Sequence, residues 1–453
     1  MRRFKLLRRF GRLRMPGVHA GRRRLSQLPS PRLPQLPSPR LPALPRIGRT
    51  RLILFLAMMG PGLITANADN DAGGIATYSI AGARFGYGML WMLLLITFSL
   101  AVTQEMGARM GVVTGQGLAA LIRERFRLKL TVVAMGAMLV ANLGTTISEF
   151  SGIATSFQLF GASKYYSVPF VAAFIWLLVV RGSYKIAERV FLVFSSFYLA
   201  YVISGILAHP DWSQALHSTV VPSFQMNSAY ILLFIAVIGT TITPWGQFFI
   251  QAYVVDKGIS IKHYRYTKAE VIMGAVVTDV VALFIIVACA ATIYASGGDI
   301  TSAEEAAQAL APLAGEFASK LFAFGLLNAS VLAAGILPLA TAYAICEAFG
   351  FESGVNRSFR EAPFFHGIFT ASIIIGVLVA LIPNVPLLNI MVLAQDVNGI
   401  LLPLILIFVM VIVNDRGIMG KYANSRLNNL IAGATTAGLI VLSLLLVATS
   451  FFT

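Results

Sequence analysis

Long apolar stretches alternate with short polar loops along almost the whole chain. A helix needs about 20 predominantly apolar residues to cross the roughly 30 Å hydrocarbon core of a bilayer. The pattern predicts an all-α integral membrane protein with eleven transmembrane helices. The predicted spans are residues 52–83, 88–112, 131–160, 166–181, 187–207, 228–256, 266–295, 312–345, 366–382, 387–413 and 429–452.

Two of these spans are interrupted. The first contains "DNDAGG" at residues 69–74, and the sixth contains "TITPWGQ" at residues 241–247. Because they lie five spans apart, the two interrupted helices enter the membrane from opposite sides. Paired broken helices in two inverted halves indicate a secondary transporter whose site lies near the bilayer midplane. We expect the halves at 49–208 and 226–414, with 428–453 as an extra helix 11.

A simpler interpretation is that glycine and proline only kink the two helices, which membrane helices tolerate. The carboxylates argue against it. An ionisable side chain inside the membrane costs several kcal/mol and is rare without a function. We therefore expect broken helices 1 and 6 to form a site within a transmembrane transporter domain, residues 49–453.

The distribution of charge adds one feature to the predicted membrane domain, a basic segment at the N-terminus. Charged residues make up 12% of the chain, about half the usual share in soluble domains. The net charge of +16 comes mainly from residues 1–51, which hold 15 of the 35 Lys and Arg and no acidic residue. "QLPSPRLP" occurs there twice in tandem, and proline at this density favours extended polyproline II. Residues 1–48 are expected to form a disordered cytoplasmic tail, and no nucleic-acid partner is expected.

The basic residues also predict the orientation. With the N-terminus in the cytoplasm, 32 of the 35 Lys and Arg fall on the inner side, as the positive-inside rule requires. This places the C-terminus outside. We expect a monomeric multi-pass protein of a bacterial plasma membrane, in contact with the lipid bilayer and without a cofactor.

An unwound helix frees backbone carbonyl groups, which accept hydrogen bonds or bind cations. Together with the Asp71 carboxylate they predict an oxygen-rich, negative site. Such a site would repel an anion and favour a hard divalent cation such as Mg²⁺, Mn²⁺ or Ca²⁺. These residues alone do not distinguish the three metals.

Several segments are specific enough to compare with a known family. They are "GPGLITANADNDAGGIATYSIAGARFGYGMLW" at 60–91, "QEMGARMGVVTGQGLAALIRERF" at 104–126, "TTISEFSGIATSFQLFG" at 145–161, "GTTITPW" at 239–245 and "LAQDVNGILLPL" at 393–404. In this order they resemble the Nramp family of divalent-metal transporters. The resemblance extends over about residues 50–450 and implies the LeuT-type 5+5 inverted repeat.

The chain departs from the family pattern in the two motifs that the resemblance assigns to metal binding. The family's Asp-Pro-Gly-Asn motif is replaced by Asp71-Ala-Gly-Gly74, and its Met-Pro-His motif by Thr243-Pro-Trp245. Loss of the soft thioether removes a preference for transition metals, and glycine in place of asparagine enlarges the site. Mg²⁺ usually keeps several waters. The sequence is most similar to the Nramp-related magnesium transporters, which implies import of Mg²⁺ and Mn²⁺ as a hydrated ion.

The resemblance, with the residues themselves, implies two sets of site residues. The expected metal-site residues are Asp71, Gly74, Thr240, Thr243, Gln395 and Asn398. Pathway or surrounding positions are Asp69, Asn70, Glu149, Trp245 and Gln247.

Some of these assignments have alternatives. Gln395 either approaches the metal or forms a helix–helix hydrogen bond. Helical geometry turns Asp396 about 100° away from Gln395 and brings Asn398 back to the same face. Asp69 either lines the site with Asp71 or caps a half-helix.

None of the five histidines lies in the middle of a span, and Thr146 stands where the family has a span 3 aspartate. Histidine is the side chain best suited to titrate near neutrality, so proton coupling is not expected. The alternatives are a proton-coupled Mn²⁺/Fe²⁺ symporter and, second, an amine or amino-acid transporter on the same fold. The sequence contains no cluster of histidines or cysteines of the kind that an enzyme site would need, so no enzyme activity is expected.

Overall fold

The computed structural model describes residues 70–181, 199–355 and 357–452, apart from the side chains of residues 181 and 447–452. The chain divides into two compact units, Met1–Leu54 and Phe55–Thr453, and every described residue lies in the second. The predicted tail, Asp69 and the first half of span 1 lie outside the described residues.

Every regular element of the described part is a helix. The principal helices are α3 (Ala72–Phe85), α4 (Leu90–Thr114), α6 (Leu128–Leu159), α7 (Lys164–Arg181), α9 (Leu199–Leu207), α11 (Ser228–Thr241), α12 (Pro244–Asp256), α13 (Tyr264–Cys289), α16 (Ala318–Phe349), α17 (Pro363–Ala380), α18 (Leu387–Asn414) and α20 (Arg426–Phe452). Shorter helices connect them: α5 (Leu118–Arg125), α10 (Trp212–Val220), α14 (Ala303–Ala307), α15 (Ala311–Ala314) and α19 (Arg416–Met419).

Eight helical segments of the described residues are long and apolar enough to cross a membrane. One of them, Ala72–Thr114, contains the second half of predicted span 1 and all of span 2. The apolar helix Lys164–Val180 is shorter and corresponds to span 4, and only Leu199–Leu207 of span 5 is described. The all-α membrane architecture is therefore confirmed. Span 8 is displaced from its predicted position, because α16 begins at Ala318 after a separate α15.

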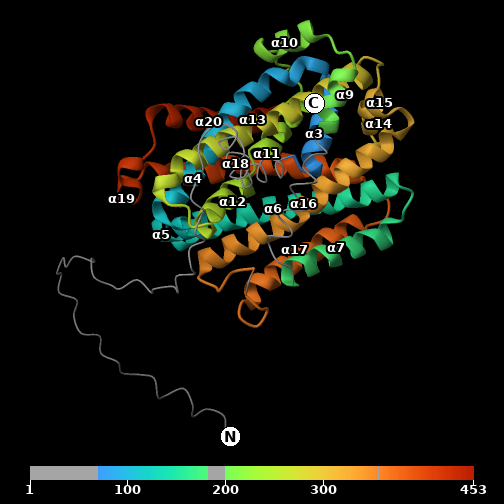
Figure 1. The fold of residues 1–453 in the computed structure, drawn as a ribbon. Helices are drawn as coiled ribbons and strands as arrows, with labels where there is room; N and C mark the ends of the chain where they lie inside the picture. The colour runs from blue at the N-terminus through green and yellow to red at the C-terminus, as the bar shows by residue number, and fades with distance from the viewer. Residues whose placement is uncertain (1–69, 182–198, 356, 453) are drawn as a thin grey trace, which may run out of the picture. The chain divides into compact units, whose positions relative to one another are not determined.

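Helix α6 lies in the middle of the packed helices. It packs against α16 and α18 over much of its length, and against α17 and α7 as well (Figure 1). Helix α4 packs in turn against α13 and α12. This arrangement brings the start of α3 close to α6 and α18, although the three helices are far apart in the sequence.

Two glycines let α11 and α18 approach backbone to backbone. A Cβ atom on Gly239 would lie 2.2 Å from the carbonyl oxygen of Gln395, and one on Gly399 would lie 2.4 Å from that of Ile235. Real Cβ contacts are never this short, so any side chain here would force the helices apart. The close approach holds Gln395 next to the end of α11.

Candidate metal site at two helix breaks

At the predicted first break, a carboxyl group lies at the start of α3. Asp71 is the N-cap residue, and its Oδ1 atom accepts a hydrogen bond from the Gly74 backbone N–H at 2.7 Å. Aspartate suits this position because its side chain satisfies an otherwise unpaired N–H of the first turn. The second oxygen, Oδ2, is buried and accepts no hydrogen bond from the described residues. Asp71 therefore caps the helix with one oxygen and keeps the other available.

A second carboxyl group lies beside it. Glu149, from α6, accepts a hydrogen bond at Oε2 from the Ala72 backbone N–H at 3.3 Å, while its Oε1 atom has no partner among the described residues. Both side chains are buried, Glu149 completely. Neither forms an ion pair with a described basic residue. Two adjacent carboxyl groups in a membrane interior require a proton or a cation to offset their charge.

Helix α18 contributes two amides from one face. The Asn398 Nδ2 atom donates to the Gln395 Oε1 atom at 2.8 Å and to the Thr145 hydroxyl at 2.9 Å. This contact confirms that Asn398 shares the face of Gln395. The Asn398 Oδ1 and Gln395 Nε2 atoms are buried and have no partner in the described part of the chain.

Gly73 sets the distance between Gln395 and α3. A Cβ atom at Gly73 would lie 1.9 Å from the Gln395 Nε2 atom, so any larger residue would displace the glutamine. Gln395 also lies within interaction range of the Asp71 carboxyl group. Its hydrogen bond with Asn398 lies within α18 and does not join two helices. The glutamine is thus a close neighbour of the candidate ligand Asp71.

The second break separates α11 from α12. Helix α11 ends at Thr241, and Thr243 caps α12 by accepting a hydrogen bond at Oγ1 from the Gly246 backbone N–H at 3.1 Å. Pro244 follows at the first helical position, where its missing N–H costs nothing. The Tyr78 and Thr241 hydroxyls form a 2.7 Å hydrogen bond that links this break to α3. The buried Thr240 hydroxyl has no partner among the described residues.

The remaining predicted residues have different surroundings. Asn70 donates from Nδ2 to the carbonyl oxygen of Thr278 on α13 at 3.4 Å. Trp245 is fully buried in an apolar cluster with α16 residues such as Leu332 and Leu337. Gln247 is fully buried, and both polar atoms of its amide lack a partner in the described chain.

Sequence reasoning missed the role of Thr145, which orients Asn398. The available signal was its position four residues before Glu149, since side chains at i and i+4 share a helix face. Elsewhere, Glu105 and Arg109 form an i,i+4 ion pair at 3.1 Å, and the Tyr264 hydroxyl and the Asn428 amide also donate to Glu105.

The family model for natural resistance-associated macrophage protein-like (Nramp) proteins matches residues 62–449 of this chain. The matched range includes both Asp71 and Thr243. The chain belongs to the Nramp family.

Among curated Nramp relatives, the divalent metal cation transporter MntH of Granulibacter bethesdensis is 22% identical over 415 residues, covering 87% of this chain and 89% of the relative. MntH of Erwinia tasmaniensis is 32% identical over 286 residues, 61% of this chain and 68% of the relative.

Solved structures agree on the fold. A crystal structure of the Eremococcus coleocola manganese transporter superposes with a TM-score of 0.73 at 21% identity, covering 90% of this chain and 88% of that one. A transporter of the nucleobase–cation symport family matches with a TM-score of 0.52 at 13% identity, over 86% and 89% of the two chains. The LeuT-type helical fold predicted from the sequence is confirmed.

Proposed function

We propose that this Nramp chain transports divalent metal cations across the membrane, with Mg²⁺ and Mn²⁺ as substrates that bind at the two helix breaks. The observation that carries the proposal is the pair of buried carboxyl groups, Asp71 and Glu149, at the N-terminus of α3. Two carboxylates offset the charge of one divalent ion. Each has one oxygen without a hydrogen-bond partner among the described residues.

The neighbouring groups are hard ligands. Asn398 and Thr240 offer an amide oxygen and a hydroxyl that are buried without partners in the described chain. Hard oxygen donors suit Mg²⁺ and Mn²⁺ and give no preference to softer transition metals. Thr243 has no soft sulfur, and its only side-chain oxygen already caps α12. We infer that waters complete the coordination shell, as is usual for Mg²⁺.

The relatives support the broad part of this proposal. The curated MntH proteins are named divalent metal cation transporters, and the structural neighbour is named a manganese transporter. The narrower choice of Mg²⁺ rests on this chain's own departures, Gly74 and Thr243, which together widen the site and remove a thioether.

In our proposal transport is not coupled to protons, because the chain lacks a histidine in the middle of any span. One observation favours the alternative of a proton-coupled symporter. Adjacent buried carboxyl groups readily share a proton, and Asp71 lies beside Glu149. Binding of a divalent cation would then displace that proton.

We further propose that the chain acts as a monomer in a bacterial plasma membrane and imports its substrate. Its N-terminus would face the cytoplasm and its C-terminus the outside, with 1–48 as a tail and the two repeats at 49–208 and 226–414. Maleimide labelling of single cysteines placed at residues 40 and 320 from each side of the membrane tests the orientation. Labelling of both positions from the same side would contradict it.

Uptake into proteoliposomes tests the proposed function. Mg²⁺, Mn²⁺ and Ca²⁺ should be supplied in parallel, with a pH-sensitive dye inside the vesicles. We expect saturable uptake of Mg²⁺ and Mn²⁺ without acidification of the lumen. Uptake of Mn²⁺ with acidification and no uptake of Mg²⁺ would favour the symporter. Uptake of no divalent metal, with transport of an amine or amino acid instead, would reject metal transport.

A further inference from the structure

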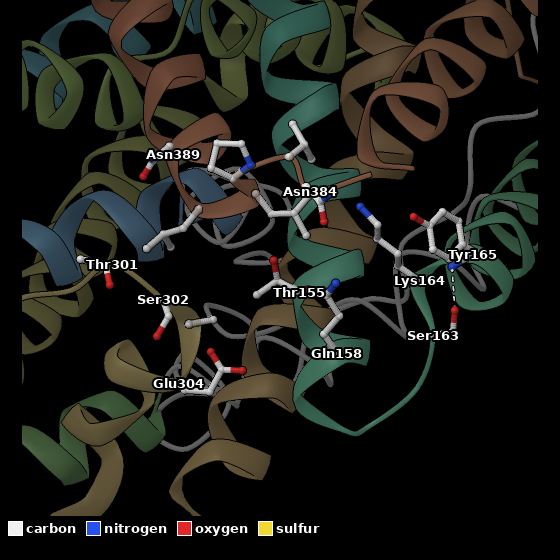
Figure 2. Close-up of a pocket in the computed structure, with 15 residues that line it drawn as sticks. Thr155, Gln158, Ser163, Lys164, Tyr165, Thr301, Ser302, Glu304, Asn384 and Asn389 are labelled. Carbon is white, nitrogen blue, oxygen red and sulfur yellow. Dashed lines mark hydrogen bonds between the residues drawn. The ribbon is translucent and has the colours of Figure 1, made fainter. Parts of the chain in front are cut away.

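A cavity of about 400 Å³, lined by both polar and apolar side chains, lies where α6 ends and α7 begins (Figure 2). The segment around α14 and the loop before α18 complete its walls. Thr155 on its wall is six residues beyond Glu149, a rise of about 9 Å along the helix. The positive-inside count predicts that this end of α6 faces outside, so the cavity would lie on the entry side of the metal site.

One end of the cavity is basic. Lys164 is 6% exposed, and its Nζ atom donates to the carbonyl oxygens of Ala380 and Ile382 at 2.9 and 2.8 Å. Two of its three donors are therefore occupied by α17 and the residues just after it. The ammonium group is held in place and is poorly available to bind an anion in the cavity.

The opposite end is acidic. Glu304 lies with Thr301 and Ser302 across the cavity from Lys164 (Figure 2). The Glu304 side chain is exposed and forms no hydrogen bond or ion pair with the described residues. Its neighbour Glu305 differs, because it accepts hydrogen bonds from the Thr301 and Ser302 backbone N–H groups at 2.6 and 2.9 Å in a capping box. Only Glu304 of the two is free to bind something in the cavity.

Thr155 lies between the two ends. Its side chain is 5% exposed, and its hydroxyl has no hydrogen-bond partner among the described residues. A buried hydroxyl without a partner is uncommon, and ordered water or an ion usually explains it. Here the hydroxyl faces a cavity whose other lining groups include the amides of Gln158 and Asn389.

We propose that the Glu304 end of this cavity binds a hydrated divalent cation before it enters the central site. The inference rests on the proposed function, since it names a first station for the same substrate. An octahedral ion with six waters of about 30 Å³ each occupies roughly 180 Å³, which the cavity accommodates. Coordinated waters donate hydrogen bonds to the Glu304 carboxylate, the Thr155 oxygen and the amide oxygens. The fixed charge of Lys164 repels the cation and keeps it at the acidic end.

Mn²⁺ binding to the Asp71→Ala variant tests the Glu304 site independently of transport, because this substitution removes the central site. Free and bound Mn²⁺ are distinguished by electron paramagnetic resonance, at low ionic strength and with intact full-length protein. We expect Asp71→Ala to retain one weak Mn²⁺ site. Adding Glu304→Gln should raise its Kd at least fivefold, and adding Thr155→Val about twofold.

Glu316→Gln is the matched control, since Glu316 is an exposed glutamate of the same inter-helix segment that does not line the cavity. It should leave the Kd unchanged. Absence of a Mn²⁺ site in Asp71→Ala would overturn the inference, as would equal effects of the Glu304 and Glu316 substitutions. Loss of Mn²⁺ binding on addition of phosphate, with phosphate binding abolished by Lys164→Gln, would show that the cavity is an anion site instead.

Uptake by otherwise wild-type protein tests the role in transport. Glu304→Gln should raise the KM for Mn²⁺ three- to tenfold at low salt with little change in kcat, and Glu316→Gln should not. An unchanged KM would refute the entry role. If the wild type transports no divalent metal while Glu304-dependent Mn²⁺ binding persists, the proposed function fails and the binding site stands.

Discussion

The two helix breaks are capped in the same way but differ in charge. At the first, an Asp71 oxygen accepts a hydrogen bond from the backbone N–H three residues later, at 2.7 Å. At the second, the Thr243 oxygen does the same at 3.1 Å. Each cap stabilises the start of a half-helix by about 1 kcal/mol. The inverted halves thus use one local solution to begin a helix inside the membrane.

The two breaks differ in the side-chain oxygens that remain without a hydrogen bond after the helix is capped. A carboxylate has two oxygens, so Asp71 caps α3 and keeps Oδ2 unpaired among the described groups. A hydroxyl has one oxygen, and in Thr243 that oxygen accepts the capping hydrogen bond. The comparison indicates that the first break supplies charge, with Glu149 beside it, while the second contributes neutral groups. In the proposed function, the first break attracts the cation and the second tunes its selectivity.

The largest effect is expected from removing the charge at the first break. Asp71→Ala should abolish transport, and Asp71→Asn should lower it on the order of 100-fold. The reason is that the bound cation loses the charge of the Asp71 carboxylate, and losing one partner of a buried charge pair costs about 3 kcal/mol. Asparagine caps a helix as well as aspartate does, whereas alanine costs about 1 kcal/mol. Uptake and thermal unfolding of both variants separate charge from capping. Mg²⁺ or Mn²⁺ uptake at the wild-type rate in either would refute the site.

The next effect concerns selectivity at the second break. Thr243→Met with Gly74→Asn should lower Mg²⁺ uptake while Mn²⁺ and Cd²⁺ binding persists or tightens, because a thioether favours softer metals and asparagine narrows the site. The two effects should not add, since both positions lie at one site. Calorimetric titration of the single and double variants, beside Mg²⁺ uptake, provides the measurement.

Thr243→Ser is the control for this change, because it retains the capping hydroxyl and adds no sulfur. It should behave as the wild type. Unchanged Mg²⁺ uptake in the double variant would move selectivity away from the second break, toward Gln395 or Asn398.

A smaller effect is expected between the breaks. Gly73→Ala should displace the Gln395 amide and lower uptake roughly 10-fold, the usual range for residues that orient a metal site. Gly325→Ala on α16 is the matched control, because a Cβ atom there has nothing within 4 Å. Equal uptake by the two variants would show that the position of Gln395 does not matter.

The smallest effect is expected outside the helices. Deleting residues 2–48 should leave uptake in proteoliposomes unchanged, because the segment is rich in proline and contains no predicted span. Loss of both membrane insertion and uptake would show that the tail contributes to the fold.

The sequence predicted the helices well because lipid imposes a strong length and polarity constraint on each span. The predicted spans 228–256 and 387–413 differ little from α11–α12 and α18. The sequence also predicted that Asp71 lies at the interruption of span 1 and that Gln395 and Asn398 share one helix face. The pairing of Asp71 with Glu149 and the role of Thr145 did not, because they depend on packing between α3, α6 and α18, which periodicity within one helix cannot specify.

Pulsed electron paramagnetic resonance of bound Mn²⁺ tests the central claim most directly, since it identifies the coordinating atoms. With purified wild-type protein in H₂O and D₂O, we predict one tightly bound Mn²⁺ with exchangeable water protons and no nitrogen directly coordinated to the metal. Asp71→Asn should lose this tightly bound Mn²⁺. Tight Mn²⁺ binding that survives Asp71→Asn, or a shell with directly coordinated nitrogen and no water, would contradict an all-oxygen, hydrated site built on the first break.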